Sequence, residues 1–380
     1  MKKYLAVAAA AAMVLASCQN AGEELQTING QQGQEISFVN MMTKGYTTGA
    51  TFYETASEDI HTAEATTTSR VMNISAYLYA QDGTEKNYFI DKTFKERETT
   101  AVWHNYVENT ETPIFWPINS KLDFLALSFT KGSKFTDETS NKTLTEKVKF
   151  DNSNCASKAV IKVVSGDASQ DDILFASKSQ QSASDNKAAG VPYDGETTPK
   201  TYASACLPLT FQHAQAWIEF ALMANQKEVI TIEKIELEDI FNGGELTVEN
   251  NNGNAKATWS FRTEESKNIP METKATAAGV TANDFGSKLL DSEKPTYFDM
   301  LIPEQAKTAF IITYKLLNNA QLESAAQTLT YRFELNHENW LMGYKYVYNI
   351  TMDAYEITVN PEVKTWDNGD VSDFNPTKIE

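Results

Sequence analysis

One cysteine near the start of the chain stands among residues suited to covalent modification. Cys18 follows Leu15, Ala16 and Ser17. A thiol that forms a thiolate is the side chain that can be alkylated to a diacylglycerol. Small residues before it let a peptidase approach the preceding bond. These residue types suit a cysteine that is alkylated and then becomes a new N-terminus.

An export signal precedes this cysteine. Lys2 and Lys3 are followed by an apolar run from Leu5 to Val14, which is too short to span a bilayer. The order of charge, apolar run and Leu-Ala-Ser-Cys resembles the lipobox of bacterial lipoproteins. The resemblance implies a signal peptide at 1–17 and lipid on Cys18, where each buried methylene contributes about 0.8 kcal/mol to membrane binding. The alternative is an ordinary secretory signal with a chance cysteine.

The rest of the sequence offers little catalytic chemistry. It contains no HExxH, P-loop, Rossmann glycine fingerprint, GxSxG or CxxC motif. None of the four histidines has a second histidine or a cysteine at a metal-ligand spacing, and His213 is expected to be a hydrogen-bonded structural residue. We therefore predict no enzyme activity, no metal and no cofactor.

Composition narrows the possible partners. The 380 residues are 41% hydrophobic, which is enough for real cores, and the net charge is −18. Removing Lys2 and Lys3 leaves 31 basic against 51 acidic residues, or −20. Such a charge argues against nucleic acid or an anionic membrane face as partner. Cys155 and Cys206 could form a disulfide in an exported protein, but sequence alone cannot bring them together.

The N-terminal region combines a polar tether with one early strand. Residues 18–35 are polar and read as a lipidated tether, followed by the strand-like Ile36-Ser37-Phe38-Val39. A polar stretch follows, with Lys44 inside it and Arg70 at its end. Arg70 is the first arginine of the chain.

Short β-strands separated by turns predict an all-β protein. Ile74, Ala76 and Leu78 alternate with polar or aromatic residues, and Asp82-Gly83 marks a hairpin. A polar stretch at 177–204 is typical of a long loop or a domain junction. We therefore predict two β-sandwich domains, at 36–200 and 201–380.

The closing segment alternates most regularly. Tyr344, Tyr346, Tyr348, Ile350 and Met352 share one strand face, and this aromatic stacking is expected to be structural. Further along, Ile357, Val359 and Val363 fall on one face of an extended strand.

Several landmarks in this order resemble fimbrillins of the Mfa-like type, the lipoprotein subunits of type V pili. Beside the lipobox they are Ile114-Phe115-Trp116-Pro117 ahead of Phe124-Leu125-Ala126, Gln170-Asp171-Asp172-Ile173-Leu174, Leu207-Pro208-Leu209-Thr210-Phe211-Gln212-His213-Ala214, Leu301-Ile302-Pro303-Glu304-Gln305 and the run from Gly343 to Trp366. The resemblance implies two tandem transthyretin-like sandwiches, no catalysis, and a surface-exposed pilus protein at the outer membrane. Its partners would be other pilus subunits, the outer membrane through the lipid on Cys18, and a host or bacterial surface ligand.

The resemblance also implies an assembly mechanism. In shaft fimbrillins a trypsin-like protease removes an N-terminal strand after a basic residue, and a strand of the next subunit fills the groove. Here Ile36-Ser37-Phe38-Val39 would be removed after Arg70, or else after Lys44, and Ile357, Val359 and Val363 would belong to the donor strand.

Three alternatives remain open. The closing residues could simply finish the second sandwich, with Arg70 an ordinary surface residue. The chain could be an accessory tip or anchor subunit with the same fold. It could also be a surface glycan-binding lipoprotein whose exposed aromatic residues stack on sugar rings.

Overall fold

The computed structural model describes residues 34–42, 70–80, 82–96, 102–107, 110–130, 135–137, 142–151, 153–163, 172–185, 206–225, 228–241, 243–261, 267–270, 272–273, 288–290, 292–318, 327–335, 338–353 and 356–365. Within these ranges the chain consists of strands and turns, with one short 3-10 helix, η2 (Ala183–Asp185), and no α-helix. The all-β prediction is confirmed. Among the same residues, no helix has the length and apolar character needed to cross a membrane.

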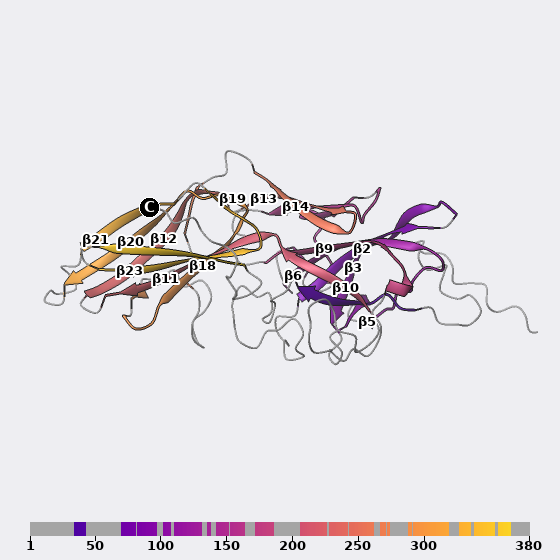
Figure 1. Cartoon of the computed structure of the whole chain (residues 1–380), viewed down its shortest axis with the longest axis horizontal. Helices are drawn as coiled ribbons and strands as arrows, with labels where there is room; N and C mark the ends of the chain where they lie inside the picture. The colour runs from indigo at the N-terminus through magenta and orange to yellow at the C-terminus, as the bar shows by residue number, and fades with distance from the viewer. Residues whose placement is uncertain are drawn as a thin grey trace, which may run out of the picture.

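The largest sheet has eight strands in the order β1-β10-β9-β6-β2-β3-β4-β5. They are β1 (Phe38–Met42), β2 (Arg70–Tyr79), β3 (Glu85–Glu96), β4 (Trp103–Val107), β5 (Thr110–Glu111), β6 (Lys121–Thr130), β9 (Leu174–Gln181) and β10 (Leu207–His213). Strand β1 is parallel to β10 and also meets β4 through Phe38 and Trp103. The sheet therefore closes on itself through β1, in the half of the molecule drawn indigo to magenta (Figure 1).

Strand β6 is buried on both faces, which explains why its sequence is almost continuously apolar. Phe124 and Ala126 point into the core enclosed by the eight-stranded sheet, whereas Leu125 and Leu127 belong to a second core outside it. A four-stranded sheet covers this second core. Its strands, in spatial order, are β14 (Asn254–Ser260), β13 (Gly244–Asn251), β8 (Lys158–Val163) and β7 (Val148–Phe150).

The β13–β14 hairpin is docked on the N-terminal strands (Figure 1). Its turn residues Asn252 and Gly253 have φ angles of 53° and 88°, as a two-residue turn of type I′ requires. Asn250 Oδ1 accepts hydrogen bonds from Gly253 N (2.8 Å) and from Ser179 Oγ of β9 (3.1 Å). The loop predicted from residue 177 begins later, because pairing with β6 carries β9 on to Gln181.

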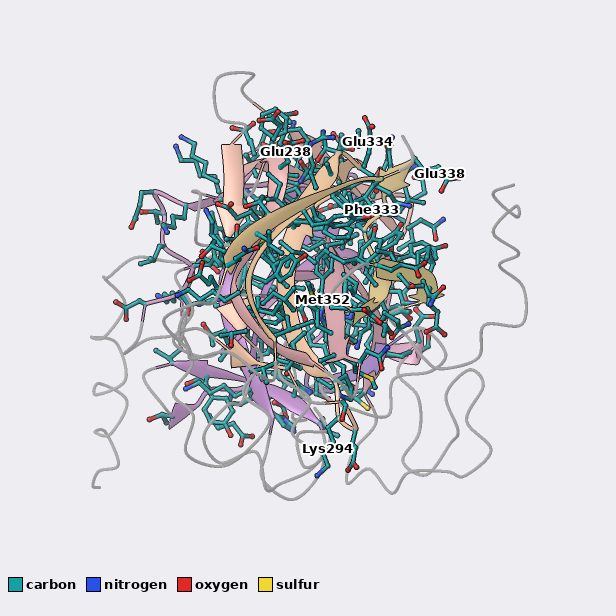
Figure 2. All side chains as sticks on the ribbon, turned by 90° about the vertical axis from the view of Figure 1, so that its left-hand side faces the viewer. Glu238, Lys294, Phe333, Glu334, Glu338 and Met352 are labelled. Atoms are coloured by element: carbon teal, nitrogen blue, oxygen red, sulfur yellow. The ribbon has the colours of Figure 1, made fainter. Side chains whose placement is uncertain are left out.

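The C-terminal strands form a sandwich around a third core (Figure 2). One sheet has the order β16 (Glu272–Thr273), β18 (Thr296–Pro303), β11 (Gln215–Ala224), β23 (Tyr344–Met352) and β24 (Ile357–Thr365). The other has the order β15 (Lys267–Pro270), β12 (Glu228–Ile240), β20 (Ala309–Asn318) and β21 (Gln327–Glu334), with β17 (Lys288–Leu289) beside β12. Phe220 packs on Phe310 and Tyr348, with ring centroids 4.8 and 5.0 Å apart. The predicted aromatic face of β23 is confirmed as part of this core.

The two halves are joined where β10 runs into β11. His213 Nδ1 lies 2.7 Å from Asp172 Oδ1, and both side chains are almost fully buried. His213 is therefore hydrogen-bonded and structural, as predicted. Trp259 Nε1 donates to the carbonyl of Ala214 (2.7 Å), which ties the four-stranded sheet to the same point. Nearby, β19 (Gln305–Ala306) pairs with β22 (Asn339–Trp340).

The sheets do not follow a division of the chain between residues 200 and 201. Strand β10 pairs with β1 and β9, and strand β13 pairs with β8. Residues on the C-terminal side of that division thus contribute to the N-terminal cores.

Candidate functional site

Strand β1 is held by main-chain pairing on both of its sides. Its register with β10 runs in parallel from Phe38 opposite Leu207 to Met42 opposite Phe211, and Phe38 also lies opposite Trp103 of β4. Each of these neighbours has another strand on its far side. Without β1, the facing edges of β10 and β4 would lose these pairing partners. A strand is present at the predicted place, but it runs from Phe38 to Met42 and not over residues 36–39. It lies between two strands that are far apart in the sequence.

Two side chains of this segment anchor it in the enclosed core. Ile36 and Phe38 are both fully buried. The ring of Phe38 meets Phe94 and Phe124 edge to face, at centroid distances of 5.0 and 5.4 Å. Burying two such side chains contributes about 3–6 kcal/mol, and each aromatic pair adds about 0.5–1.5 kcal/mol. Ile36 and Phe38 therefore anchor the entry of β1 in the enclosed core.

The residues just before β1 are held by a second set of main-chain bonds. Ile36 N donates to Ile114 O (2.7 Å), and Trp116 N donates to Gln34 O (2.9 Å). Tyr88 supports the same segment, since its hydroxyl donates to the carbonyl of Phe115 (2.7 Å). Burial raises the pKa of Tyr88 to about 12, so the hydroxyl keeps its proton at neutral pH.

The Ile-Phe-Trp-Pro landmark therefore has a structural role. Its main chain from Ile114 to Trp116 runs antiparallel to residues 34–36 and forms hydrogen bonds with them. Trp116 itself packs on Phe124 with ring centroids 5.7 Å apart.

The three predicted donor residues lie on the last strand of the C-terminal sandwich. Strand β24 pairs with β23 over its whole length, from Ile357 opposite Met352 to Thr365 opposite Tyr344. It is the edge of its five-stranded sheet. Ile357, Val359 and Val363 are half-buried and pack against the C-terminal core. In this single chain they complete the second sandwich.

The opposite sheet ends in a similar edge. On β21, Leu329, Tyr331 and Phe333 are half-buried against the same core, and the residues between them are exposed. The ring of Phe333, which is labelled in Figure 2, stacks on that of Phe310 with centroids 5.1 Å apart. The C-terminal core is thus bordered by two edge strands whose apolar faces are only partly covered.

Of the residues predicted to be cleavage or lipidation sites, the structure describes only Arg70. Arg70 is the first residue of β2, where its main chain lies opposite Thr130 of β6. Cys18 and Lys44 lie outside the described residues.

Neither of the two remaining cysteines is part of a disulfide. Cys155 and Cys206 are both buried. Burial raises the pKa of the Cys155 thiol to about 12, which keeps it protonated and poorly reactive.

One cluster of potential ligands was not expected from the sequence. Glu35, His104 and Glu111 each bring a side-chain donor atom to within 4.8 Å of the others. Glu35 is 69 residues away from His104, and only the closure of the sheet brings them together. In the sequence, His104 has no histidine or cysteine at a metal-ligand spacing. That spacing gives no information about which carboxylates lie near it in the fold.

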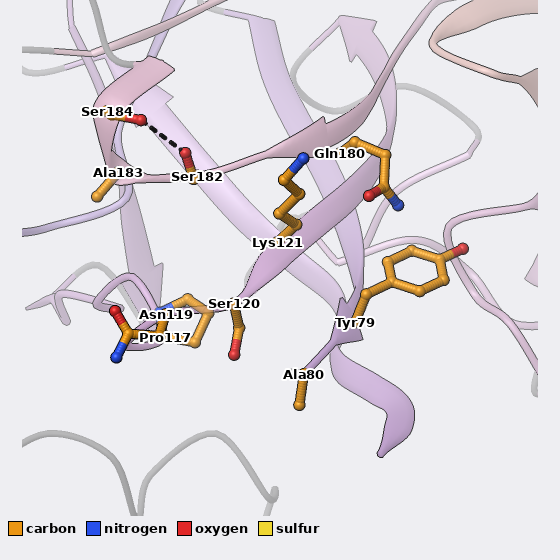
Figure 3. Close-up of a pocket in the computed structure, with 10 residues that line it drawn as sticks. All are labelled: Tyr79, Ala80, Pro117, Asn119, Ser120, Lys121, Gln180, Ser182, Ala183 and Ser184. Carbon is orange, nitrogen blue, oxygen red and sulfur yellow. Dashed lines mark hydrogen bonds between the residues drawn. The ribbon is translucent and has the colours of Figure 1, made fainter. Parts of the chain in front are cut away.

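A surface pocket of about 450 Å³ lies at the ends of β2, β6 and β9 (Figure 3). Its lining is rich in hydroxyl and amide groups and includes Tyr79, Asn119, Lys121 and Gln180. Asn119 and Gln180 have φ angles of 52° and 56°, a conformation that costs energy for a side-chain-bearing residue. Such a pocket can hydrogen-bond a polar ligand.

Solved structures that are similar to this chain include fimbrial and cell adhesion proteins. A fimbrial protein from Bacteroides vulgatus is 15% identical, with 88% of this chain and 99% of that chain covered and a TM-score of 0.50. A cell adhesion protein from Bacteroides ovatus is 13% identical, with 90% and 100% covered and a TM-score of 0.47. The fimbrial anchor protein Mfa2 from Porphyromonas gingivalis is 8% identical, with 88% and 98% covered and a TM-score of 0.32. A search of curated protein sequences finds no match.

Sequence supplies the decisive comparison. A family profile described as fimbrillin-like matches residues 62–366, about four-fifths of the chain. The match includes the Ile-Phe-Trp-Pro segment, β9 to β11 and all of β24, which are the regions that carried the resemblance. The chain therefore belongs to the fimbrillin-like family.

Proposed function

We propose that this chain is a structural and adhesive subunit of a type V pilus, and that subunits join by exchange of strand β1. Fimbrillin-like proteins are structural adhesion proteins rather than enzymes, as predicted for this chain. The observation that carries the proposal is the position of β1. It fills a slot between β10 and β4, and its anchors Ile36 and Phe38 are fully buried.

Removal of β1 would leave an acceptor groove. The pairing edges of β10 and β4 would be exposed together with apolar residues of the enclosed core. An open edge beside an apolar groove is the arrangement that binds an added strand. Cleavage after Arg70, or else after Lys44, would free the segment that contains β1.

The C-terminal segment supplies a matching strand. Ile357 and Val359 are two residues apart, as Ile36 and Phe38 are, so they would face the same groove when the strand is extended. Burying Ile357, Val359 and Val363 contributes roughly 5–9 kcal/mol, and each ladder hydrogen bond adds about 0.5–1.5 kcal/mol. Association costs an estimated 4–15 kcal/mol, so most of the ladder must form in the filament. To act as the donor strand, β24 would first have to separate from β23, with which it pairs within its own chain.

The proposal extends to export and architecture. Cleavage before Cys18 and lipid on its sulfur would hold the chain at the outer membrane, exposed at the cell surface and reached through the tether 18–35. The two halves would correspond to tandem transthyretin-like sandwiches, with the strand exchange occurring at the N-terminal one.

Brief trypsin treatment of the purified chain tests the mechanism. We expect a product that begins after Arg70 or Lys44, together with SDS-resistant ladders. A variant that lacks residues 355–380 should be cleaved in the same way and form no ladders. Ladders that persist in this variant would exclude the C-terminal donor strand.

A second candidate function is glycan binding at the pocket of Figure 3. The pocket has a hydroxyl-rich lining and two residues with positive φ angles. Sustained tight binding of one glycan in a polysaccharide screen, lost in Lys121→Ala, would favour this function.

Electron microscopy of cells with an antibody to the chain separates shaft from tip or anchor subunits, because a shaft subunit is labelled along the filament.

A further inference from the structure

A buried histidine and two carboxylates meet where residues 34–36 enter the N-terminal sheet. His104 lies on β4, Glu111 on β5, and Glu35 immediately precedes the buried Ile36. His104 Nδ1 is 2.9 Å from Glu35 Oε1 and 3.8 Å from Glu111 Oε1. The β4–β5 hairpin and a segment 69 residues before it thus bring three donor atoms close together.

The imidazole is buried, and the two carboxylates beside it are partly exposed. The His104 side chain is 1% exposed, and its Nε2 has no hydrogen-bond partner among the described residues. All polar contacts of the imidazole are therefore made through Nδ1, on the side of the carboxylates. Glu35 and Glu111 are 27% and 30% exposed, so an ion could enter and retain a water ligand.

The electrostatics favour a cation over a hydrogen bond alone. A proton on Nδ1 would lie close to Glu35 but 3.8 Å from Glu111 Oε1, whereas a cation at this point would contact both carboxylates. Two ligand atoms bound at 2.0–2.1 Å in tetrahedral geometry are about 3.3 Å apart. The distances from His104 Nδ1 to Glu35 Oε1 (2.9 Å) and to Glu111 Oε1 (3.8 Å) lie below and above this value. Imidazole and carboxylate together are the ligands of first-row dications.

We propose that Glu35, His104 and Glu111 bind one divalent cation of the zinc class. The ion would cross-link the entry of β1 to the β4–β5 hairpin and neutralise the two carboxylates. It would hold β1 in place until the ion is lost. The site itself follows from the geometry, and only its effect on subunit joining rests on the proposed function.

Direct binding tests the site. We would strip the purified full-length chain, carrying no histidine tag, with a chelator and titrate it with ZnCl2 by calorimetry. One zinc ion per chain is expected, together with the absorption bands of tetrahedral Co²⁺ when cobalt replaces zinc. His104→Gln and Glu111→Gln should each weaken binding about tenfold or more, whereas Glu249→Gln, at an exposed carboxylate on β13, should not. Equal binding by all four proteins would overturn the site.

Hydrogen exchange tests the effect on the strand. If opening of β1 breaks the site, zinc at 100 times its Kd should lower the opening equilibrium about 100-fold at residues 36–42. Glu111→Gln, on β5, should reduce this protection at the same zinc concentration to about tenfold or less while leaving the zinc-free exchange unchanged. Zinc-independent exchange in the parent chain would show that the ion does not hold β1 in place, and would overturn this effect of the site.

These outcomes are separable from failure of strand exchange. Absence of zinc binding leaves the trypsin-induced ladders untouched. Conversely, a chain that binds zinc and protects β1 but never forms ladders would retain the site and refute the proposed assembly.

Discussion

Phe38→Ala removes the ring that holds β1 in the closed N-terminal sheet. The ring is fully buried and packs edge to face on Phe94 and Phe124. Truncating a buried Phe to Ala costs about 3–5 kcal/mol, because apolar burial is lost and a cavity remains. Because β1 pairs with β4 at a single residue pair, we expect the lost free energy to favour detachment of β1 over unfolding of the whole sheet. The opening equilibrium should rise between about 100-fold and a few thousand-fold.

Hydrogen exchange at residues 34–42 measures this opening, and the rate of ladder formation at fixed trypsin measures its consequence. Both should increase in Phe38→Ala, while amides of β6 and β9 remain protected. The matched control is Phe310→Ala, which truncates a fully buried ring in the C-terminal core. It should destabilise that sandwich by a similar amount and leave exchange at β1 unchanged.

Two results would refute this reasoning. Unchanged exchange at residues 34–42 would mean that the ring does not anchor the strand. Simultaneous loss of protection in β1, β6 and β9 would mean that β1 cannot leave without unfolding the whole N-terminal sheet.

Three further predictions concern other parts of the chain. Cys18→Ala should leave the protein out of the membrane fraction, and a palmitate analogue should label the parent chain but not this variant; an unlabelled parent chain would refute lipidation. Because the pKa of Tyr88 is raised in the fold from 10.0 to about 12, its contribution to stability is complete below pH 10 and is lost as the pH rises through 12. Tyr88→Phe should cost about 0.5–1.5 kcal/mol in urea unfolding at pH 7 and flatten this alkaline loss, and an unchanged alkaline profile would assign the loss to other groups. Val359→Asp should reduce ladder formation at least about tenfold by placing a carboxylate in the acceptor groove, whereas Asn360→Asp on the exposed face should not, and equal ladders from both would contradict the donor assignment.

Local pattern was sufficient to predict many elements. The alternating residues Ile74, Ala76 and Leu78 lie in β2, and the Asp82-Gly83 turn lies between β2 and β3, which pair as a hairpin. Ile36-Ser37-Phe38-Val39 was recognised because a short apolar run stands between polar stretches. These signals depend on neighbours in the chain, so they can be read without the fold.

Long-range pairing could not be predicted in the same way. Phe38 lies opposite Leu207, and no local pattern selects that partner from the many apolar strands. The same holds for β13, which pairs with β8 of the N-terminal half although it follows β12 in the chain. A domain boundary inferred from composition alone therefore separates strands that pair with each other in the fold.

The candidate metal site shows this limit most clearly. Sequence motifs for metals depend on ligands at fixed spacing, whereas Glu35, which precedes β1, and His104 of β4 lie 69 residues apart and meet only in the folded sheet. A histidine that looked isolated in the sequence thus acquires two carboxylate neighbours through topology.

The most direct test of strand exchange is a high-resolution reconstruction of filaments formed after trypsin treatment. The density between β10 and β4 should trace to residues 357–365 of the neighbouring subunit, with Ile357 and Val359 pointing into the enclosed core. Density in that position that belongs to residues 36–42 of the same chain would contradict the account, because the subunits would then be joined with β1 still in place.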